Sequence, residues 1–531
     1  MDPIRICLVV ALGATPARTK PRVMVRSMSV PRLSVLVLAI SISLTSCGFL
    51  SSPEVAPPTA KSPVVPTPAG LESFYNQEVV WRNCGDADCA TIIVPVDYAD
   101  PKGPTTKLAI TKVKANGESI GSLFVNPGGP GGSAFDYAKA ADYIVSPDIR
   151  DNYDIVGVDP RGVVHSSPIT CLTDQQRDEI LEVDGTPDNP AEEQQVIEVA
   201  AQIGQSCKEK GGALFAHMGT VEAARDLDIA RALVNDPVLN YLGKSYGSGI
   251  GIVYSQLFPA NVGRMVLDGV LPPDLTLEQV SKEQAEAFEV AVDDFAADCV
   301  TQSDCPFVGD GPSVADQLRA WLQELDSKPI RLGERILNEP VASYALLSYL
   351  YFPPSDYAKL RPALSAAVVD GNAKPLFELL DARISRGIDG QYLDNSTEAF
   401  YAVICLDRPF LGDQVKVQQL AKDWKVLAPT FGAAQAWGLL TCANWPAKSA
   451  EQPPVVRANL APPMLIVSTK HDPATPYQWG EQLANQLGNA RLLTWDRHQH
   501  TGYTNGSECI DAAVDTFWLS GELPAAGVVC D

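Results

Sequence analysis

The sequence feature that most constrains the fold is the segment Gly-Lys-Ser-Tyr-Gly at residues 243–247. The mostly apolar residues 239–242 predict a buried strand before it, and the apolar spacing in 248–253 predicts a helix after it. A serine on so tight a strand-to-helix turn takes a strained backbone conformation, for which glycines two positions before and after it leave room. The turn would hold the Ser245 hydroxyl above a sheet, beside N–H groups at a helix N-terminus. Alone, the segment also fits a plain glycine-rich turn, so its meaning depends on the rest of the chain.

Length and charge limit the classes of function. A chain of 531 residues that is 46% hydrophobic can bury a sizeable core and is expected to form more than one domain. Its formal net charge is −23, and it has no long basic run. Nucleic-acid binding and electrostatic attachment to anionic lipid are therefore not expected.

The N-terminal region predicts export. Arg26 and Arg32 precede an apolar run at 33–44, which is too short to span a bilayer and ends in Leu-Thr-Ser-Cys. This ending is typical of a bacterial lipoprotein signal, in which the thiol of Cys47 is lipidated and the acyl chains hold the protein on the outer face of the cell membrane. The alternative is an ordinary signal peptide with an incidental cysteine.

The cysteine content agrees with an oxidising compartment. Apart from Cys7 and Cys47 the chain has an even number of cysteines, which predicts five disulfides. Connectivity stays open at this point, although sequential pairing would close only short loops. Zinc is the competing interpretation, but no pair has C-x-x-C spacing and no histidine lies near, so neither a metal nor another cofactor is expected. The ten cysteines are Cys84, Cys89, Cys171, Cys207, Cys299, Cys305, Cys405, Cys442, Cys509 and Cys530.

Short β-branched segments alternate with helical patterns in two separate parts of the chain, which predicts an α/β fold with a mostly parallel sheet covered on both faces. The first two strands, around a turn, are expected to be antiparallel. Strands are expected at 90–98, 107–113, 122–125, 153–158, 239–242, 264–268, 463–468 and, as the last one, 491–495, with helices at 221–234 and 477–487.

Between the two α/β parts the alternation stops. Thr276 and Gln279 form a capping box that opens a long amphipathic helix, and helical patterns then continue to about residue 451. This pattern predicts an inserted, mainly helical cap domain. The predicted organisation is a leader at 1–47, a Pro-rich linker at 48–72, a first core part at 73–274, the cap at 275–455 and a second core part at 456–531.

The order of three residues favours an enzyme. Ser245 is followed by Asp472, on a loop after a predicted strand, and then by His500, after the next strand. Serine, acid and histidine occur in this order on α/β-hydrolase sheets. A neutral imidazole activates the weakly nucleophilic serine, and the carboxylate orients that imidazole and stabilises its charged form.

Other residues compete for two of these roles. His498 and His471 are alternatives to His500 as the base, and Asp496 is an alternative to Asp472 as the acid. The remaining histidines, expected on the surface or in satisfied core positions, are His165 and His217.

A glycine-rich loop, Asn-Pro-Gly-Gly-Pro-Gly-Gly-Ser at 126–133, follows an early predicted strand. Its backbone could approach the nucleophile closely, so that an N–H of Gly128 or Gly129, with the N–H of Tyr246, would form an oxyanion hole. A phosphate-binding loop is the alternative, but the loop contains neither G-x-x-x-x-G-K-[ST] nor G-x-G-x-x-G.

Several motifs together resemble the exported tripeptidyl-aminopeptidase-like (TAP-like) α/β-hydrolases of actinobacteria, relatives of proline iminopeptidase. The resemblance covers about residues 75–531 and implies an α/β-hydrolase fold with a helical cap, and a triad of Ser245, Asp472 and His500. One departure is Asn126-Pro127, where iminopeptidases have a histidine before the glycines, and this leaves the oxyanion donor open. The motifs are the glycine-rich loop, Asp-Pro-Arg-Gly at 159–162, Gly-Lys-Ser-Tyr-Gly, Phe-Pro at 258–259, Val-Leu-Asp-Gly at 266–269, Cys-Leu-Asp at 405–407, Cys-Ala-Asn-Trp-Pro at 442–446 and His-Asp-Pro-Ala-Thr-Pro at 471–476.

The resemblance implies a serine exopeptidase whose cap holds the free N-terminus of a peptide, and the protein is expected to be a monomer. Asp407 is the candidate ligand for that ammonium group, and the alternative for it is a helix-packing aspartate beside a disulfide. The main hypothesis is release of short N-terminal peptides through an acyl-enzyme. A carboxylesterase acting on small or lipid esters is the second hypothesis, because fold does not determine substrate. An inactive binding protein on the cell surface is the third.

Overall fold

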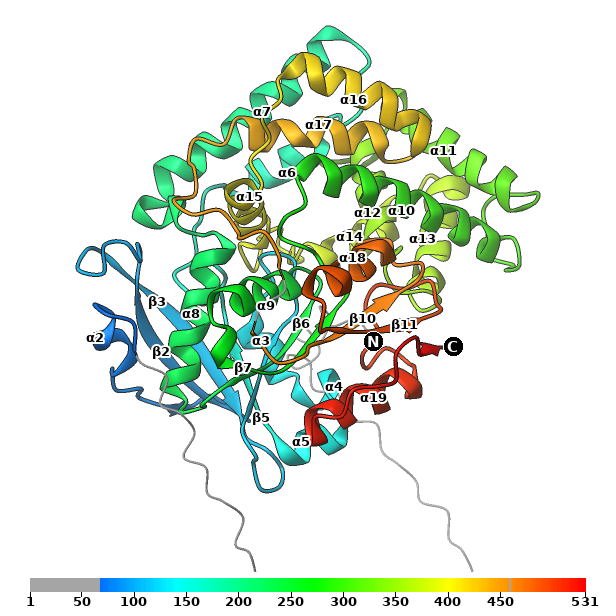
Figure 1. Ribbon diagram of the computed structural model, residues 1–531. Helices are drawn as coiled ribbons and strands as arrows, with labels where there is room; N and C mark the ends of the chain where they lie inside the picture. Colours follow the sequence, from blue (N-terminus) through cyan, green and yellow to red (C-terminus); the bar gives the residue numbers. More distant parts are fainter. Residues whose placement is uncertain (1–66, 458–459) are drawn as a thin grey trace, which may run out of the picture.

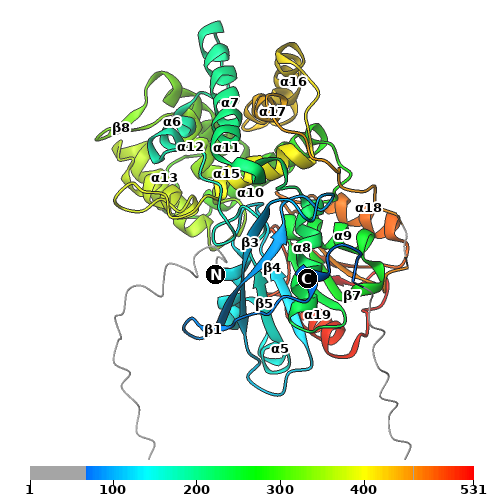
Figure 2. The same ribbon diagram turned by 90° about the vertical axis from the view of Figure 1, so that its left-hand side faces the viewer.

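The computed structural model describes residues 67–457 and 460–531. The predicted leader, the lipidation of Cys47 and most of the predicted linker lie outside the described residues. Figures 1 and 2 show two layers, an α/β body that contains the sheet and a helical layer above it. Within the described ranges, no helix combines the length and the apolar character that crossing a membrane requires.

The body is built on one ten-stranded sheet with the order β1-β2-β3-β5-β4-β6-β7-β10-β11-β12. From β5 to β12 neighbouring strands are parallel, while β1, β2 and β3 extend the sheet as antiparallel strands. The predicted mostly parallel sheet with an antiparallel beginning is confirmed. The strands are β1 Arg82–Asn83, β2 Asp88–Pro95, β3 Thr105–Val113, β4 Ser122–Asn126, β5 Asp154–Val158, β6 Leu239–Lys244, β7 Val262–Asp268, β10 Leu465–Thr469, β11 Arg491–Trp495 and β12 Val529–Cys530.

Helices cover both faces of the sheet, which explains why β4 and β10 are buried along their whole length. Side chains alternate along each strand, so Tyr241 packs on the face of α8, α9 and α18, and Leu242 packs on the face of α3, α4, α5 and α19. The body helices are α2 Glu72–Tyr75, α3 Ala134–Lys139, α4 Ala141–Ile144, α5 Pro147–Asn152, α8 Thr220–Leu233, α9 Tyr246–Leu257, α18 Tyr477–Leu487, α19 Glu508–Ser520 and the short 3₁₀ turns Gly212–Ala216 and Pro259–Asn261.

The helical layer contains the predicted insertion. The first helix of this insertion, α10, begins at the predicted capping box, in which Thr276 and Gln279 exchange hydrogen bonds. A small hairpin, β8–β9, interrupts the helices and was not predicted. The elements are α10 Leu277–Cys299, α11 Gly311–Ser327, β8 Ile330–Leu332, β9 Arg335–Leu337, α12 Glu339–Ser348, α13 Tyr357–Asp370, α14 Lys374–Arg383, α15 Ser396–Asp407, α16 Gln414–Leu427 and α17 Gly432–Ala443.

Two further details differ from the expected organisation. Helices α6 (Asp174–Glu182) and α7 (Pro190–Lys210) fall within the predicted first core part, yet they lie in the helical layer (Figure 1). Ala200 and Ile203 of α7 belong to the same buried cluster as Leu440 of α17, so burial of an apolar helix face draws this segment out of the body. The sheet also gains β12 after the strand that was expected to be last.

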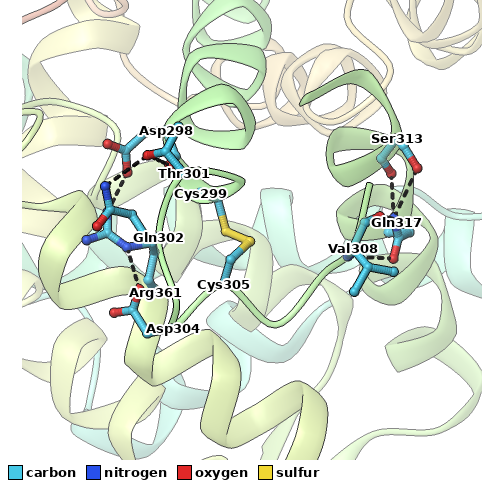
Figure 3. The surroundings of a disulfide bond; sticks show 10 residues. All are labelled: Asp298, Cys299, Thr301, Gln302, Asp304, Cys305, Val308, Ser313, Gln317 and Arg361. Atoms are coloured by element: carbon cyan, nitrogen blue, oxygen red, sulfur yellow. Dashed lines mark hydrogen bonds and ion pairs between the residues drawn. A yellow bond between two sulfur atoms is a disulfide. The ribbon is translucent and has the colours of Figure 1, made fainter. Parts of the chain in front are cut away.

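Five disulfides join the ten cysteines in sequential pairs, and the predicted number is confirmed. The pairs are Cys84–Cys89, Cys171–Cys207, Cys299–Cys305, Cys405–Cys442 and Cys509–Cys530. Figure 3 shows Cys299–Cys305 closing the turn after α10, where Arg361 forms ion pairs with Asp298 and, at 2.9 Å, with Asp304. The Cys171–Cys207 and Cys405–Cys442 bonds hold the helical layer together from inside its core.

Candidate active site

The turn at Ser245 has the strained geometry that the glycine spacing predicts. Strand β6 ends at Lys244, α9 begins at Tyr246, and Ser245 between them has φ 54° and ψ −127°. A Cβ on Gly243 would lie 2.4 Å from the carbonyl oxygen of Gly247, so a side chain there would clash with the backbone. The unusual φ of a non-glycine residue at the C-terminal edge of a central parallel strand is typical of a nucleophile in this fold.

Asp472 and His500 meet in a buried pair. Nδ1 of His500 lies 2.9 Å from both carboxylate oxygens of Asp472, and the side chains are 7% and 0% exposed respectively. The carboxylate also accepts hydrogen bonds from the N–H groups of Ala474 (2.9 Å), Thr475 (2.8 Å) and Thr501 (3.3 Å). These donors fix the position of the carboxylate, which can then orient the imidazole and balance its charge.

The end of β7 connects the serine turn to the loop after β11 that carries the histidine, here called the histidine loop (residues 496–503). The N–H of Ser245 donates to the main-chain oxygen of Asp268 at 2.9 Å. The side chain of Asp268 accepts hydrogen bonds from the N–H groups of Gly502 (2.7 Å) and Tyr503 (3.0 Å). Nucleophile and histidine therefore attach to the same strand end.

The competing histidine and acid lie on the outside of the histidine loop. The His498 side chain is 46% exposed, forms a hydrogen bond with Asp294 of α10 and stacks on the ring of His471 at 4.0 Å. Asp496 pairs with Lys470 at 2.6 Å, and that lysine holds the pKa of Asp496 below its usual range. Neither His498 nor Asp496 occupies the place expected of a triad member, and the same holds for His471, which is exposed and stacks on His498.

The glycine-rich loop approaches the serine turn as expected, but it corrects one predicted donor. A Cβ on Gly128 would lie 2.9 Å from Cβ of Ser245, so the loop backbone passes directly over the nucleophile. The N–H of Gly128, however, donates to Oδ1 of Asn126 at 2.9 Å and is not directed at an oxyanion. Asn126, the departure from the iminopeptidase histidine, thus binds its own loop, and Gly129 and Tyr246 are left as candidate donors.

Asp159, of the Asp-Pro-Arg-Gly motif, fixes the exit of the same loop. It is fully buried and accepts hydrogen bonds from the Ser133 hydroxyl (2.8 Å), the Phe135 N–H (2.8 Å) and the His165 N–H (3.0 Å). Burial raises the pKa of Asp159 to about 6 although these donors oppose the rise. The motif thus anchors the start of α3, immediately after the glycines.

The helical layer touches the histidine directly. The N–H of His500 donates to the main-chain oxygen of Tyr351 at 2.9 Å, and the Tyr351 ring packs edge-on against the imidazole at 5.5 Å between centroids. Phe352 lies at 6.4 Å from the same ring. On the sheet side, a Cβ on Gly269 would lie 3.3 Å from Cε1 of His500. A side chain at this position would therefore crowd the imidazole ring.

Asp407 takes the helix-packing role that the sequence left as an alternative. It is 5% exposed, and its two oxygens accept hydrogen bonds from the N–H (2.9 Å) and the hydroxyl of Thr220 at the start of α8. The same hydroxyl contacts the Tyr246 hydroxyl at 2.7 Å. Asp407 therefore ties α15 of the helical layer to the body, and both of its carboxylate oxygens are engaged by Thr220.

We expect Asp407→Ala to lower the free energy of unfolding by about 1–3 kcal/mol, because two buried donors of Thr220 lose their acceptor. Its KM for peptides should stay within about threefold of the wild-type value, because a structural residue adds no substrate binding of its own. Thermal unfolding and steady-state kinetics of the same preparation check both values. A large rise in KM at unchanged stability would instead restore the substrate-binding role.

A cluster of acidic side chains in the helical layer is the group in the described ranges whose geometry could suit a cation. Single oxygens of Asp184, Asp326 and Glu339 lie within 4.8 Å of one another. Burial and the neighbouring Asp184 raise the pKa of Glu339 to about 7, and Thr186 donates to both Asp184 and Glu339. Partial protonation of Glu339 near neutral pH lowers the mutual repulsion of the three side chains, and nothing further among the described residues around them indicates a metal ligand set.

Sequence reasoning missed the roles of Asp268 and Tyr351. The Val-Leu-Asp-Gly motif contains Asp268 and marks the end of a strand, which was the available signal. Nothing in the local sequence of Tyr351 indicates contact with a residue 149 positions away, since that contact depends on how the helical layer sits on the body.

Comparison with known proteins agrees with this architecture. The family described as TAP-like protein matches residues 428–530. Serine protease Hip1 of Mycobacterium tuberculosis is 35% identical over 484 residues, which cover 86% of this chain and 92% of the relative. Carboxylesterase B of the same species is 36% identical over 514 residues, covering 92% and 98%.

A third relative comes from another actinobacterial genus. Tripeptidyl aminopeptidase of Streptomyces lividans is 32% identical over 481 residues, covering 85% of this chain and 86% of the relative. Each of these relatives matches at least 85% of this chain and at least 86% of its own length. The chain belongs to the tripeptidyl-aminopeptidase-like (TAP-like) family of α/β-hydrolases.

Proposed function

We propose that this protein is an exported, lipid-anchored serine peptidase that releases short peptides from the N-terminus of its substrates through a Ser245–His500–Asp472 triad. The observation that carries the proposal is the buried His500–Asp472 pair, attached through Asp268 to the turn of Ser245. A strained serine, an oriented imidazole and a fixed carboxylate are the parts that acyl transfer requires.

In the proposed reaction, the Ser245 hydroxyl attacks the scissile carbonyl while Nε2 of His500 takes its proton. The imidazolium then gives that proton to the departing amine, and an acyl-enzyme remains on Ser245. Water enters, His500 takes a proton from it, and the hydroxide attacks the ester carbonyl. The imidazolium then returns the proton to the departing Ser245 oxygen, which releases the N-terminal fragment and restores the free enzyme. Throughout, Asp472 keeps the Nδ1 proton of His500 in place and balances its positive charge.

The negative charge that develops on the carbonyl oxygen needs donors beside Ser245. The N–H of Tyr246, at the start of α9, and that of Gly129 are the proposed pair, because the N–H of Gly128 already donates to Asn126. Removing one donor of this kind from a serine hydrolase typically costs about 100- to 1,000-fold in kcat.

Peptides are the favoured substrates because two of the relatives are named a serine protease and a tripeptidyl aminopeptidase. The five disulfides agree with an oxidising, extracytoplasmic location. Lipid attachment at Cys47 rests on the leader sequence, and we expect the protein to act as a monomer.

Ester hydrolysis is the second candidate because one relative is named Carboxylesterase B. The same triad serves amides and esters, so the substrate must be decided by binding. A catalytically silent binding protein, the third possibility, would not need the buried pair of His500 and Asp472.

The test offers the purified protein a chromogenic tripeptidyl substrate, its N-acetylated counterpart, an aminoacyl substrate and a short acyl ester. We expect the tripeptidyl substrate to be cleaved best and its N-acetylated form at least about tenfold more slowly, because a free ammonium group would contribute about 1.4 kcal/mol or more. Turnover of the ester alone would contradict the peptidase assignment. Absence of turnover and of labelling by a fluorophosphonate would favour the binding protein.

A further inference from the structure

A buried lysine–aspartate pair lies directly behind the proposed triad. Lys244 precedes the nucleophile, and Asp268 ends the neighbouring strand β7. Their side chains are 6% and 0% exposed, and Nζ of Lys244 lies 3.8 Å from Oδ2 of Asp268. Burying two such charges costs several kcal/mol per ion unless hydrogen bonds compensate them. If the pair served packing alone, apolar side chains of similar volume would fill the same space without this cost.

The compensating hydrogen bonds all go to one segment, the end of the histidine loop. Asp268 accepts from the N–H groups of Gly502 and Tyr503, while Nζ of Lys244 donates to the main-chain oxygen of Tyr503 at 2.5 Å. The pair thus binds three polar groups of the backbone in two adjacent residues, two and three positions beyond His500. Both charged groups use their hydrogen bonds to hold this backbone in one position.

The pair is equally attached to the nucleophile. The main-chain oxygen of Asp268 accepts the N–H of Ser245, and Lys244 is its covalent neighbour. The opposite end of Tyr503 is held too, because its hydroxyl donates to Asp515 at 2.7 Å and accepts from the N–H of Ser146. The histidine loop is therefore clamped between the serine turn and the body helices.

The charges of Asp268 and Lys244 also stabilise each other. Burial raises the pKa of Asp268 and lowers that of Lys244, and each opposes the shift of the other. Asp268 accepts two N–H donors, one on each oxygen, which suits the carboxylate form. Its negative charge also interacts favourably with a protonated His500.

We propose that Asp268 and Lys244 are positioning residues that set the distance between the Ser245 hydroxyl and the His500 imidazole. This inference rests on the proposed triad. Neither side chain touches the reacting atoms, and both act through the backbone of the histidine loop. A small displacement of His500 would lengthen the proton-transfer path, and misplacement by about 1 Å can cost on the order of 100-fold in rate.

The test uses two variants that retain side-chain size. Asp268→Asn replaces one acceptor oxygen with an NH₂ group that cannot accept the second N–H, and Lys244→Met removes the donor to Tyr503. We expect each to lower kcat by about 10- to 100-fold at a KM within about threefold of wild type. Rates are measured on the best peptide substrate across the acidic limb of the pH profile.

The pH profile separates positioning from simple packing. Asp268→Asn removes a negative charge near His500, while Asp511, the other carboxylate that interacts with Lys244, remains. The acidic limb of kcat/KM should therefore move to lower pH, by on the order of 0.5 pH unit. Lys244→Met leaves an unbalanced carboxylate and should move the limb in the opposite direction. A double variant, Lys244→Met with Asp268→Asn, should return the limb toward wild type while kcat stays low.

Asp228→Asn is the matched control. Asp228 is a buried carboxylate of α8 that accepts hydrogen bonds from Tyr254 and Asn261, so this variant should lose stability without any shift of the pH limb. Wild-type kcat in both Asp268→Asn and Lys244→Met, or reduced stability with an unmoved limb, would overturn the inference. If Asp268→Asn does not fold, Lys244→Met and the neutral double variant decide the matter. Full activity of Ser245→Ala would instead contradict the proposed function itself.

Discussion

Ser245→Ala is expected to abolish peptide turnover, lowering kcat by about five to six orders of magnitude. The loss should be this large because the acyl-enzyme cannot form and the remaining oxyanion donors and binding contacts supply only a small residual acceleration. Folding should be unaffected, since the strain at φ 54° belongs to the backbone and alanine removes only the hydroxyl. Initial rates and the thermal unfolding midpoint of wild type and variant check both statements.

Ser255→Ala is the control for this experiment. Ser255 is a buried serine of α9, ten residues from the nucleophile, whose hydroxyl donates to the main-chain oxygen of Ile252 at 2.8 Å. Its removal should leave kcat within about threefold of the wild-type value, because Ser255 makes no contact with the reacting atoms. A fluorophosphonate should label wild type and Ser255→Ala but not Ser245→Ala. Labelling of Ser245→Ala at the wild-type rate would place the nucleophile elsewhere.

His500→Ala should have an effect of similar size, again about five to six orders of magnitude in kcat, because the nucleophile loses its base and the leaving group its acid. His498→Ala, two residues earlier, should retain kcat within about threefold, since His498 contacts Asp294 at the exposed side of the loop and not the His500–Asp472 pair. The two variants are measured side by side on the same peptide substrate. Near-normal activity of His500→Ala with an inactive His498→Ala would reverse the assignment.

Much of the body could be predicted from the sequence because its patterns are local. Strands β4, β5, β6 and β10 were expected within two residues of their observed ends, and α18 was expected at its observed bounds. Apolar runs bounded by turn residues carry this information in a few consecutive positions. The two-residue strand β12 and the β8–β9 hairpin are too short to leave such a pattern.

The helical layer was predicted less completely. Its main insertion was recognised from the loss of strand–helix alternation and from the capping box at Thr276. Helices α6 and α7 were left in the body, because an amphipathic helix shows that it has an apolar face without showing which partner covers it. The partner of α7 is α17, more than 200 residues later in the chain.

For the site, the sequence by itself determined the residue types, their order and the turn at Ser245, since glycine spacing and strand ends are properties of neighbouring residues. The tertiary structure decided which of several similar residues meet. It paired Asp472 with His500 and left His498 outside, directed the N–H of Gly128 to Asn126, and placed Asp407 against Thr220. It also brought Asp268 and Lys244 behind the histidine loop. Hydrogen bonds act over about 3 Å, and the two partners of most of these contacts are separated by tens to hundreds of residues, so only the packed fold brings them within reach.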